Sequence, residues 1–339
     1  MSVTRRRTLL SAAMLLGTVV ASGGSAASPP LIPEGSEPAV IASGFKWSEG
    51  PVWIADGGYL LFSDVPNNRI HRWSGGTEAK IFLEPSGGTA TTGFREPGSN
   101  GLKPGPAGSI IIADQGNRGV ALLDLKTHAK RALAQQYGGK KLNSPNDVAV
   151  GPDGAIWFTD PPYGLEGIND SPLKEQPANG VYRIGMDGTV TLIDGELTFP
   201  NGLAFSPDGR TLYVSSSDPE KAVIMKYAVG PDGSVSGKTL FADFTSDAKA
   251  GKPGLPDGMT VDEHGNLWAT APGGVRILSP DGKEIGRIDH DKPISNAAFG
   301  GPDGRTLFMT ASDQILALKI NVRGAPARMP VLPSGSNEP

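Results

Sequence analysis

The 339-residue sequence contains no cysteine and only four histidines. Without cysteine, the protein can form neither disulfides nor thiolate metal sites, and it has no cysteine nucleophile. A Ser–His–Asp triad needs a histidine beside a serine. The four histidines fall on an outer strand, after a strand, in a turn and in a connector, which favours surface or packing roles. They are His71, His128, His264 and His290.

An excess of basic residues is also missing. Lysine and arginine number 31 against 35 aspartates and glutamates, so the formal net charge is −4. Nucleic acids and anionic membranes attract basic surfaces, so we expect neither as a partner. No stretch shows sustained helical periodicity. The glycine-rich stretches, such as Gly87 and Gly88, match no nucleotide-binding motif.

An export signal is predicted at the N-terminus. Arg5, Arg6 and Arg7 precede an apolar stretch at residues 9–21, and small residues follow at 25–27. This order is typical of a cleavable signal, and the arginine pair resembles a twin-arginine signal, which exports folded proteins. We expect removal of residues 1–27 and a periplasmic or secreted protein free of the membrane. A lipid-embedded N-terminal anchor is the alternative.

The rest of the chain repeats about every fifty residues, and the 47 glycines and 30 prolines suit its many turns. Each of six copies has a glycine turn followed by a short apolar run, a pattern typical of hairpins. A second run follows each copy and a third follows most, which predicts four strands per unit. The pattern therefore predicts an all-β fold, a six-bladed β-propeller. The turn glycines are Gly57, Gly108, Gly154, Gly209, Gly265 and Gly304.

The sixth unit runs out of sequence before its fourth strand. Residues 39–44, which precede the first unit, can supply this outer strand and so close the ring. An unpaired sheet edge would otherwise invite aggregation. We expect one propeller domain over residues 39–323, with a linker at 28–38 and a polar tail at 324–339.

A side chain with a carboxylate or amide oxygen lies eight residues before each turn glycine. Serine, threonine and glycine, which would also serve as turn residues, are missing from this set. Equivalent positions form a ring around a propeller axis, so six oxygens point towards one spot. Hard oxygen ligands select Ca²⁺ or Mg²⁺, and several amides favour the larger Ca²⁺. The six residues are Glu49, Asn100, Asn146, Asn201, Asp257 and Asn296.

Four phrases around these residues resemble the family of gluconolactonases and regucalcin, and more distantly the organophosphate-hydrolysing propellers. They lie at residues 47–53, 144–147, 200–206 and 256–259. The resemblance covers nearly all of the chain after about residue 40. A fifth phrase, at residues 158–164, is similar to the bacterial gluconolactonase branch.

The resemblance implies a calcium-dependent lactonase that acts on a small sugar lactone such as gluconolactone. It also implies which residues form the site. The direct metal ligands would be Glu49, Asn146, Asn201 and Asp257. We interpret Asn100 and Asn296 as outer-shell or substrate contacts. Asp160 and Tyr163 are our further candidates for substrate contact, and plain loop packing is the alternative for Tyr163.

A cation with open coordination positions can polarise a lactone carbonyl and activate a water molecule. Hydrolysis then needs only a base. Asp257 matches the residue proposed for that role in the family, and Glu49 is the alternative. Two other functions remain open: a broader lactonase or organophosphate hydrolase, and a non-catalytic ligand-binding propeller with a structural calcium ion. A structural cation is usually caged, and an all-polar ring argues against that last reading.

Overall fold

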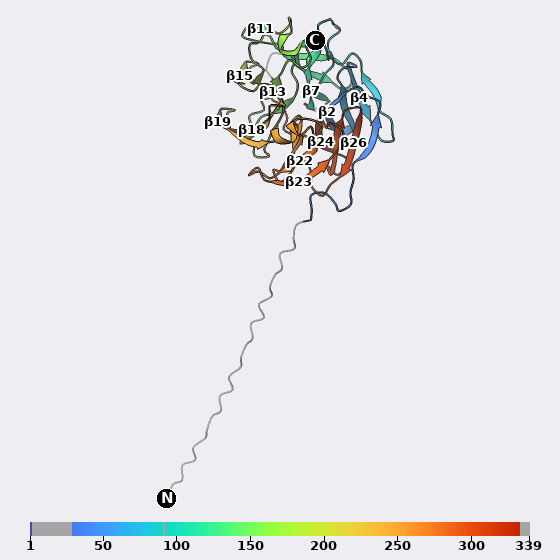
Figure 1. Cartoon of the computed structure of the whole chain (residues 1–339), viewed down its shortest axis with the longest axis vertical. Coiled ribbons are helices and arrows are strands. Elements are labelled where there is room, and N and C mark those ends of the chain that lie inside the picture. Colours follow the sequence, from blue (N-terminus) through green and yellow to red (C-terminus); the bar gives the residue numbers. More distant parts are fainter. Residues whose placement is uncertain (2–28, 91, 107, 333–339) are drawn as a thin grey trace.

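Six four-stranded antiparallel sheets surround a central axis and form a six-bladed β-propeller (Figure 1). This computed structural model describes Met1 and residues 29–90, 92–106 and 108–332. The predicted export signal therefore lies outside the described residues, Met1 excepted. Within the described part of the chain, no helix is long and apolar enough to cross a membrane. The fold predicted from the repeat is confirmed.

The first strand of each sheet lies nearest the axis, where it contacts the first strands of the neighbouring blades. Blade 1 comprises β2 (Ser48–Ile54), β3 (Tyr59–Asp64), β4 (Arg69–Trp73) and β5 (Lys80–Leu83). Blade 2 comprises β6 (Leu102–Pro104), β7 (Ser109–Asp114), β8 (Gly119–Asp124) and β9 (Lys130–Ala134). Blade 3 comprises β12 (Val148–Val150), β13 (Ile156–Asp160), β14 (Gly180–Ile184) and β15 (Val190–Asp194).

The remaining blades follow the same order from the axis outwards. Blade 4 comprises β16 (Pro200–Phe205), β17 (Thr211–Asp218), β18 (Lys221–Val229) and β19 (Val235–Asp243). Blade 5 comprises β20 (Met259–Val261), β21 (Leu267–Ala271), β22 (Gly274–Leu278) and β23 (Glu284–Asp289). Blade 6 comprises β24 (Asn296–Gly300), β25 (Thr306–Ala311), β26 (Gln314–Lys319) and β1 (Ala39–Ser43).

A few short elements lie between the blades. They are the hairpin of β10 (Gln136–Tyr137) and β11 (Lys140–Lys141), the helix α1 (Thr245–Lys249), and the 3₁₀ turns η1 (Ala55–Gly57), η2 (Gln115–Asn117) and η3 (Ile168–Asp170).

The turn between β2 and β3 differs from the pattern expected at the turn glycines. Positive φ occurs at five of the six glycines predicted for the turns, but here it falls on Gly58, because Gly57 closes η1.

The hydrophobic core is divided among the interfaces between neighbouring blades. Leu61 and Ile70 of blade 1, for example, pack against Leu102 and Leu123 of blade 2, and all four are fully buried. Alternation along the strands places one apolar row on each face of a blade, so both faces bury side chains. The blades are therefore packed face to face through six separate apolar layers.

The ring is closed by strand β1, as predicted. It pairs antiparallel with β26, matching Ala39 with Ala317 and Ser43 with Gln314. The outermost strand of blade 6 thus comes from the beginning of the chain, while its three inner strands come from the end (Figure 1). Ala42 is buried by this pairing and packs beside Ile315.

The segment at residues 324–332, expected as a tail, instead packs across the end of the propeller axis. Backbone N–H groups of Ala325 and Val331 donate to Val261 of blade 5 and Gly154 of blade 3, each at 2.9 Å. Between them, the Arg328 guanidinium donates to the carbonyls of Ser206 and Pro207 of blade 4, at 2.9 and 2.7 Å. This C-terminal strap therefore ties three blades together.

Beneath the strap lies a cavity of about 500 Å³, lined by the far ends of the inner strands and by Arg328. The expected linker also packs against the domain. Leu31 and Ile32 contact the core of blade 6, and the Asn321 N–H donates to the Leu31 carbonyl at 2.9 Å.

Removing β1 should destabilise the whole ring. We expect a chain that begins at residue 45 to melt at least ~5 °C below one that begins at residue 29, since each kcal/mol shifts the Tm of a large domain by about 2 °C and losing a strand costs a few kcal/mol. Thermal unfolding followed by circular dichroism measures the difference. Equal Tm values would mean that β1 is dispensable for closure.

Candidate functional site

The six oxygen-bearing residues predicted to form a ring all lie at the start of an inner strand or one or two residues before it. Hydroxyl groups of neighbouring blades hold their backbones. The Ser63 hydroxyl donates to the Asn100 carbonyl at 2.8 Å, and the Thr159 hydroxyl donates to the Asn201 carbonyl at 2.6 Å. Ser215 donates in the same way to the Asp257 carbonyl, at 2.8 Å. Blades 1, 3 and 4 thus position the site residues of blades 2, 4 and 5.

Glycine follows four of the six residues and permits the close approach of the blades. A Cβ atom on Gly50 would lie 2.2 Å from the Asn100 carbonyl oxygen, and one on Gly202 would lie 2.3 Å from that of Asp257. Real Cβ atoms do not approach backbone oxygens so closely, so no larger residue fits without moving a blade. Gly50 also adopts a φ of +51°, which side chains disfavour.

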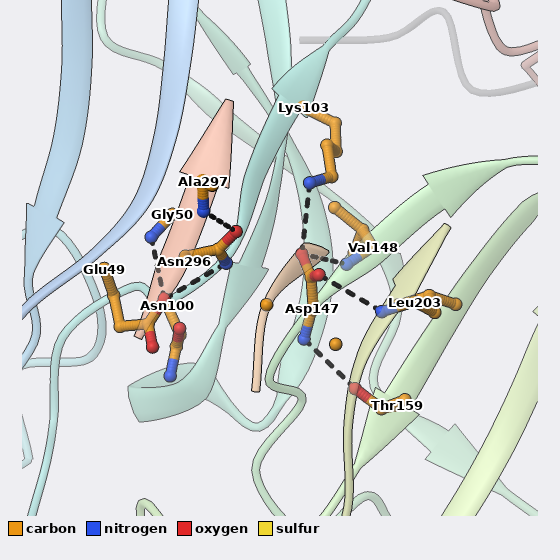
Figure 2. Close-up of polar contacts among 12 residues, drawn as sticks. Glu49, Gly50, Asn100, Lys103, Asp147, Val148, Thr159, Leu203, Asn296 and Ala297 are labelled. Carbon is orange, nitrogen blue, oxygen red and sulfur yellow. Dashed lines mark hydrogen bonds and ion pairs between the residues drawn. The ribbon is translucent and has the colours of Figure 1, made fainter. Parts of the chain in front are cut away.

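Five of the six ring residues line one cavity of about 680 Å³ at the axis: Glu49, Asn100, Asn146, Asn201 and Asp257. None of the four histidines lines it. Asn296 lies beside Glu49 but outside the cavity lining, and its Nδ2 donates to Glu49 Oε2 at 3.2 Å (Figure 2). The residues at the shared offset, predicted as metal ligands, therefore lie together. Asn296 holds one of them, Glu49, by a hydrogen bond.

The two carboxylates in the cavity are electrostatically unfavourable as they stand. Burial raises the pKa of Glu49 to about 7, and repulsion from Asp147 and Glu96 adds to this effect. The pKa of Asp257 is raised well above its usual range by burial and then by repulsion from Glu49. A positive charge between the two carboxylates would relieve both effects.

The amides present oxygen atoms that fit such a charge. Asn100 Nδ2 donates to Gln115 Oε1 at 3.0 Å, and Asn201 Nδ2 donates to Ser217 Oγ at 2.9 Å. The Oδ1 atoms of these two asparagines are buried and accept no hydrogen bond from the described residues. No group of three or more His, Cys, Asp or Glu side chains in the described ranges is arranged to hold a metal. A cation here would thus depend on amides as well as carboxylates, a set that suits Ca²⁺.

Asp147 and Lys103 form an ion pair beside this ring that sequence reasoning did not identify (Figure 2). Lys103 Nζ lies 3.6 Å from Asp147 Oδ1, and the carboxylate also accepts from the N–H groups of Val148 and Leu203. Burial raises the pKa of Asp147, although Lys103 opposes the shift. Because Lys103 also lines the cavity under the strap, the pair lies between the two cavities.

Asp160 does not occupy the place expected of a substrate contact. It is fully buried and absent from the cavity lining. Its Oδ2 accepts from the Asn143 N–H at 2.7 Å, and its carbonyl accepts from Asn143 Nδ2 at 2.9 Å. The predicted role of Asp160 is therefore corrected: it lies outside the cavity lining and holds the loop that leads to Asn146.

Tyr163 lines the cavity, as expected for a substrate-facing residue. Its ring stacks on Phe199 with centroids 5.6 Å apart. The cavity also contains Trp47, Arg95 and Glu96, which sequence reasoning did not place in the site. Arg95 and Glu96 lie in a loop outside the repeat, so the shared offset could not reveal them.

Comparison with known proteins gives a consistent set of relatives. The family model described as "SMP-30/Gluconolactonase/LRE-like region" matches residues 47–313. A gluconolactonase from Zymomonas mobilis is 44% identical over 291 residues, which cover 84% of this chain and 82% of the relative.

Solved structures of similar proteins share the fold. A gluconolactonase from Xanthomonas campestris superposes with a TM-score of 0.72 at 30% identity, covering 87% of this chain and 95% of the other. A calcium-binding protein from Agrobacterium tumefaciens, regucalcin, has a TM-score of 0.66 at 22% identity, with 90% and 98% coverage.

Breaking the Lys103–Asp147 pair should weaken the fold. We expect Lys103→Met to lower the free energy of unfolding by about 3 kcal/mol, because removing one partner leaves a buried charge uncompensated. Urea denaturation in chelator-treated protein measures the loss, and Lys126→Met, at an exposed turn, is the control. A value within ~0.5 kcal/mol of the parent, the usual range for surface changes, would contradict an energetic role for the pair.

Proposed function

The chain belongs to the SMP-30/gluconolactonase/LRE-like family, and from this premise we propose that it hydrolyses a small sugar lactone, such as D-glucono-lactone, with the help of a divalent cation. It is a gluconolactonase-like hydrolase that acts on a cyclic carboxylic ester. One observation supports the cation most strongly: two buried carboxylates, Glu49 and Asp257, line one cavity with Asn201, whose buried amide oxygen accepts no hydrogen bond from the described residues.

The residues proposed to hold the cation are Glu49, Asn146, Asn201 and Asp257. When bound, Ca²⁺ or another divalent cation supplies Lewis acidity that polarises the lactone carbonyl. Asn296 and the Gly50 N–H both donate to Glu49 Oε2, so this carboxylate is held in one orientation. Asn100, tied to Gln115, offers its Oδ1 to the cavity as a substrate contact.

Asp257 is the favoured base. Both carboxylates line the cavity, but Asp257 is more exposed than Glu49, which is 2% exposed, and so is more accessible to a substrate water. Its carboxylate takes a proton from the attacking water as the new C–O bond forms at the carbonyl carbon. The ring C–O bond then breaks, and the leaving oxygen takes up a proton to give the hydroxy acid. Glu49 is the alternative base.

Lactone hydrolysis should depend on both the cation and the two carboxylates. We expect exhaustive chelation to abolish hydrolysis of D-glucono-δ-lactone and added Ca²⁺ to restore it. Asp257→Asn should lose at least ~100-fold in kcat even at saturating Ca²⁺, the usual scale for removing a general base. Glu49→Gln should be partly rescued by excess Ca²⁺, because it loses one anionic ligand and keeps an oxygen.

These rates are measured by pH-stat titration of the acid produced, with Glu220→Gln, an exposed carboxylate in blade 4, as the control. Full recovery of Asp257→Asn in excess Ca²⁺ would make Asp257 a ligand only. Undiminished hydrolysis after chelation would refute a catalytic cation. Hydrolysis of organophosphates in preference to sugar lactones would favour the broader hydrolase, and metal binding without any turnover would favour a binding protein.

We also propose that residues 1–27 export the protein by the twin-arginine route, so that it acts in the periplasm or outside the cell. The support is the order of Arg5, Arg6 and Arg7, the apolar stretch and the small residues at 25–27. Replacing all three arginines by lysine should leave full-length protein in the cytoplasm of a bacterial host, as judged by cell fractionation. Unchanged export would exclude this route, and retention of the parent protein in the membrane fraction would indicate an anchor.

A further inference from the structure

We propose that Arg95 and Glu96 form a clamp for neighbouring hydroxyl groups of the substrate, and that this clamp selects polyhydroxylated lactones over unsubstituted ones. The proposal deepens the lactonase function proposed above and rests on it. Neither residue belongs to the repeated ring, yet both line the cavity that contains Glu49 and Asp257.

The two side chains form a polar surface within the cavity. Arg95 Nη2 lies 2.6 Å from Glu96 Oε1, and the exposed fractions of the side chains are 48% and 17%. A guanidinium has five N–H donors and a carboxylate has two acceptor oxygens, so the ion pair leaves N–H donors of Arg95 and the second oxygen of Glu96 for a ligand. Adjacent hydroxyl groups each donate and accept, and they match such a pair better than an isolated carbonyl does.

The net charge of the pair indicates which ligand groups it can bind. Because Glu96 neutralises Arg95, the clamp offers no net charge to a phosphate or carboxylate group. Burial raises the pKa of Glu96, and Arg95 opposes this shift by its charge and its hydrogen bond. Uncharged hydroxyl groups are therefore the ligands that fit it.

Backbone hydrogen bonds to blade 3 hold the loop that carries the clamp. The N–H groups of Arg95 and Glu96 both donate to the Gly164 carbonyl, at 2.9 and 3.3 Å, and the Glu166 N–H donates to the Gly93 carbonyl at 2.9 Å. A loop following blade 1 is thus fastened to a loop of blade 3. Such preorganisation reduces the entropy lost when a ligand is bound.

Gln115 connects the clamp to the ring. Its Nε2 donates to the Glu96 carbonyl at 3.0 Å, while its Oε1 accepts from Asn100 Nδ2 at 3.0 Å. Gln115 is fully buried, so this connection cannot shift independently of the fold. The position of the clamp relative to the reacting carbonyl is therefore fixed by the same side chain that orients Asn100.

The other walls of the cavity suit a sugar ring. Trp47, Tyr163 and Leu255 present aromatic and aliphatic surface to the same cavity. The C–H faces of a sugar ring pack on such surfaces, while its hydroxyl groups require the polar partners that the clamp supplies. A lactone without hydroxyl groups would use only the apolar surfaces and the site at the axis.

The proposal is tested by comparing two lactones with the same six-membered ring, D-glucono-δ-lactone and the unsubstituted δ-valerolactone. In Glu96→Gln and in Arg95→Met we expect kcat/KM for the sugar lactone to fall about 10- to 100-fold, the usual scale for losing a charge-assisted hydrogen bond. For δ-valerolactone the change should stay within about threefold. Glu166→Gln, an exposed carboxylate in the loop that anchors the clamp, is the matched control and should change neither value.

A binding measurement separates this proposal from the lactonase function. The ring polyol 1,5-anhydro-D-glucitol has the hydroxyl groups but no ester, and we expect its calorimetric affinity for the parent to fall at least tenfold in Glu96→Gln. Tm should be unchanged in the same variant, and Ca²⁺ affinity should change much less than polyol affinity, because Glu96 acts on Glu49 through its charge and is not one of the proposed ligands. Equal losses for both lactones, or unaltered polyol binding, would overturn the clamp. If the parent binds the polyol, loses this binding in Glu96→Gln and hydrolyses neither lactone, the lactonase function is refuted, whereas hydroxyl binding by Arg95 and Glu96 is supported.

Discussion

The backbones of neighbouring blades touch around the axis, and the rest of the molecule depends on this contact. Gly50 and Gly202 approach the carbonyl oxygens of the next blade more closely than any side chain would permit. Hydroxyl groups such as those of Ser63 and Ser215 then bond the same carbonyls. Because the contact recurs between blades, one short sequence pattern gathers oxygen-bearing side chains around the axis, and five of the six line one cavity. The apolar layers between blades hold the ring together but leave its centre polar.

Carboxylates gathered around the axis destabilise the folded protein when no cation is bound. Glu49 and Asp257 are crowded, and burial and mutual repulsion raise the pKa of both. The nearby cation Lys103 pairs with Asp147 and so compensates a different carboxylate. Stability and function therefore oppose each other at the axis, as is common where charged groups are gathered for catalysis. A cation that binds between these carboxylates therefore also raises the stability of the folded state.

The repeated features of this protein could be predicted from sequence, and the features present once could not. Six copies of a turn and an offset identify the blades, the closing strand and the residues around the axis. Asp160 was misplaced because its phrase repeats nowhere, and a family likeness does not say which way a side chain faces. Asp147, Arg95 and Glu96 escaped notice for the same reason. The strap at 324–332 reads as a polar tail because its hydrogen bonds come from backbone groups and one arginine, and a few apolar residues such as Leu332 show no strand periodicity.

Closure of blade 6 by β1 has a consequence for how the protein is made. The first strand leaves the ribosome early and stays without its partner until β26, near the other end of the chain, has been synthesised. Blades 1 to 5 can form during translation, but the ring cannot. Glu49 meets Asn296 only when that last blade takes its place, so the polar centre is assembled in a single late event. A nascent chain interrupted before blade 6 would therefore contain the four proposed cation ligands, but neither the closed ring nor the Asn296 amide that holds Glu49.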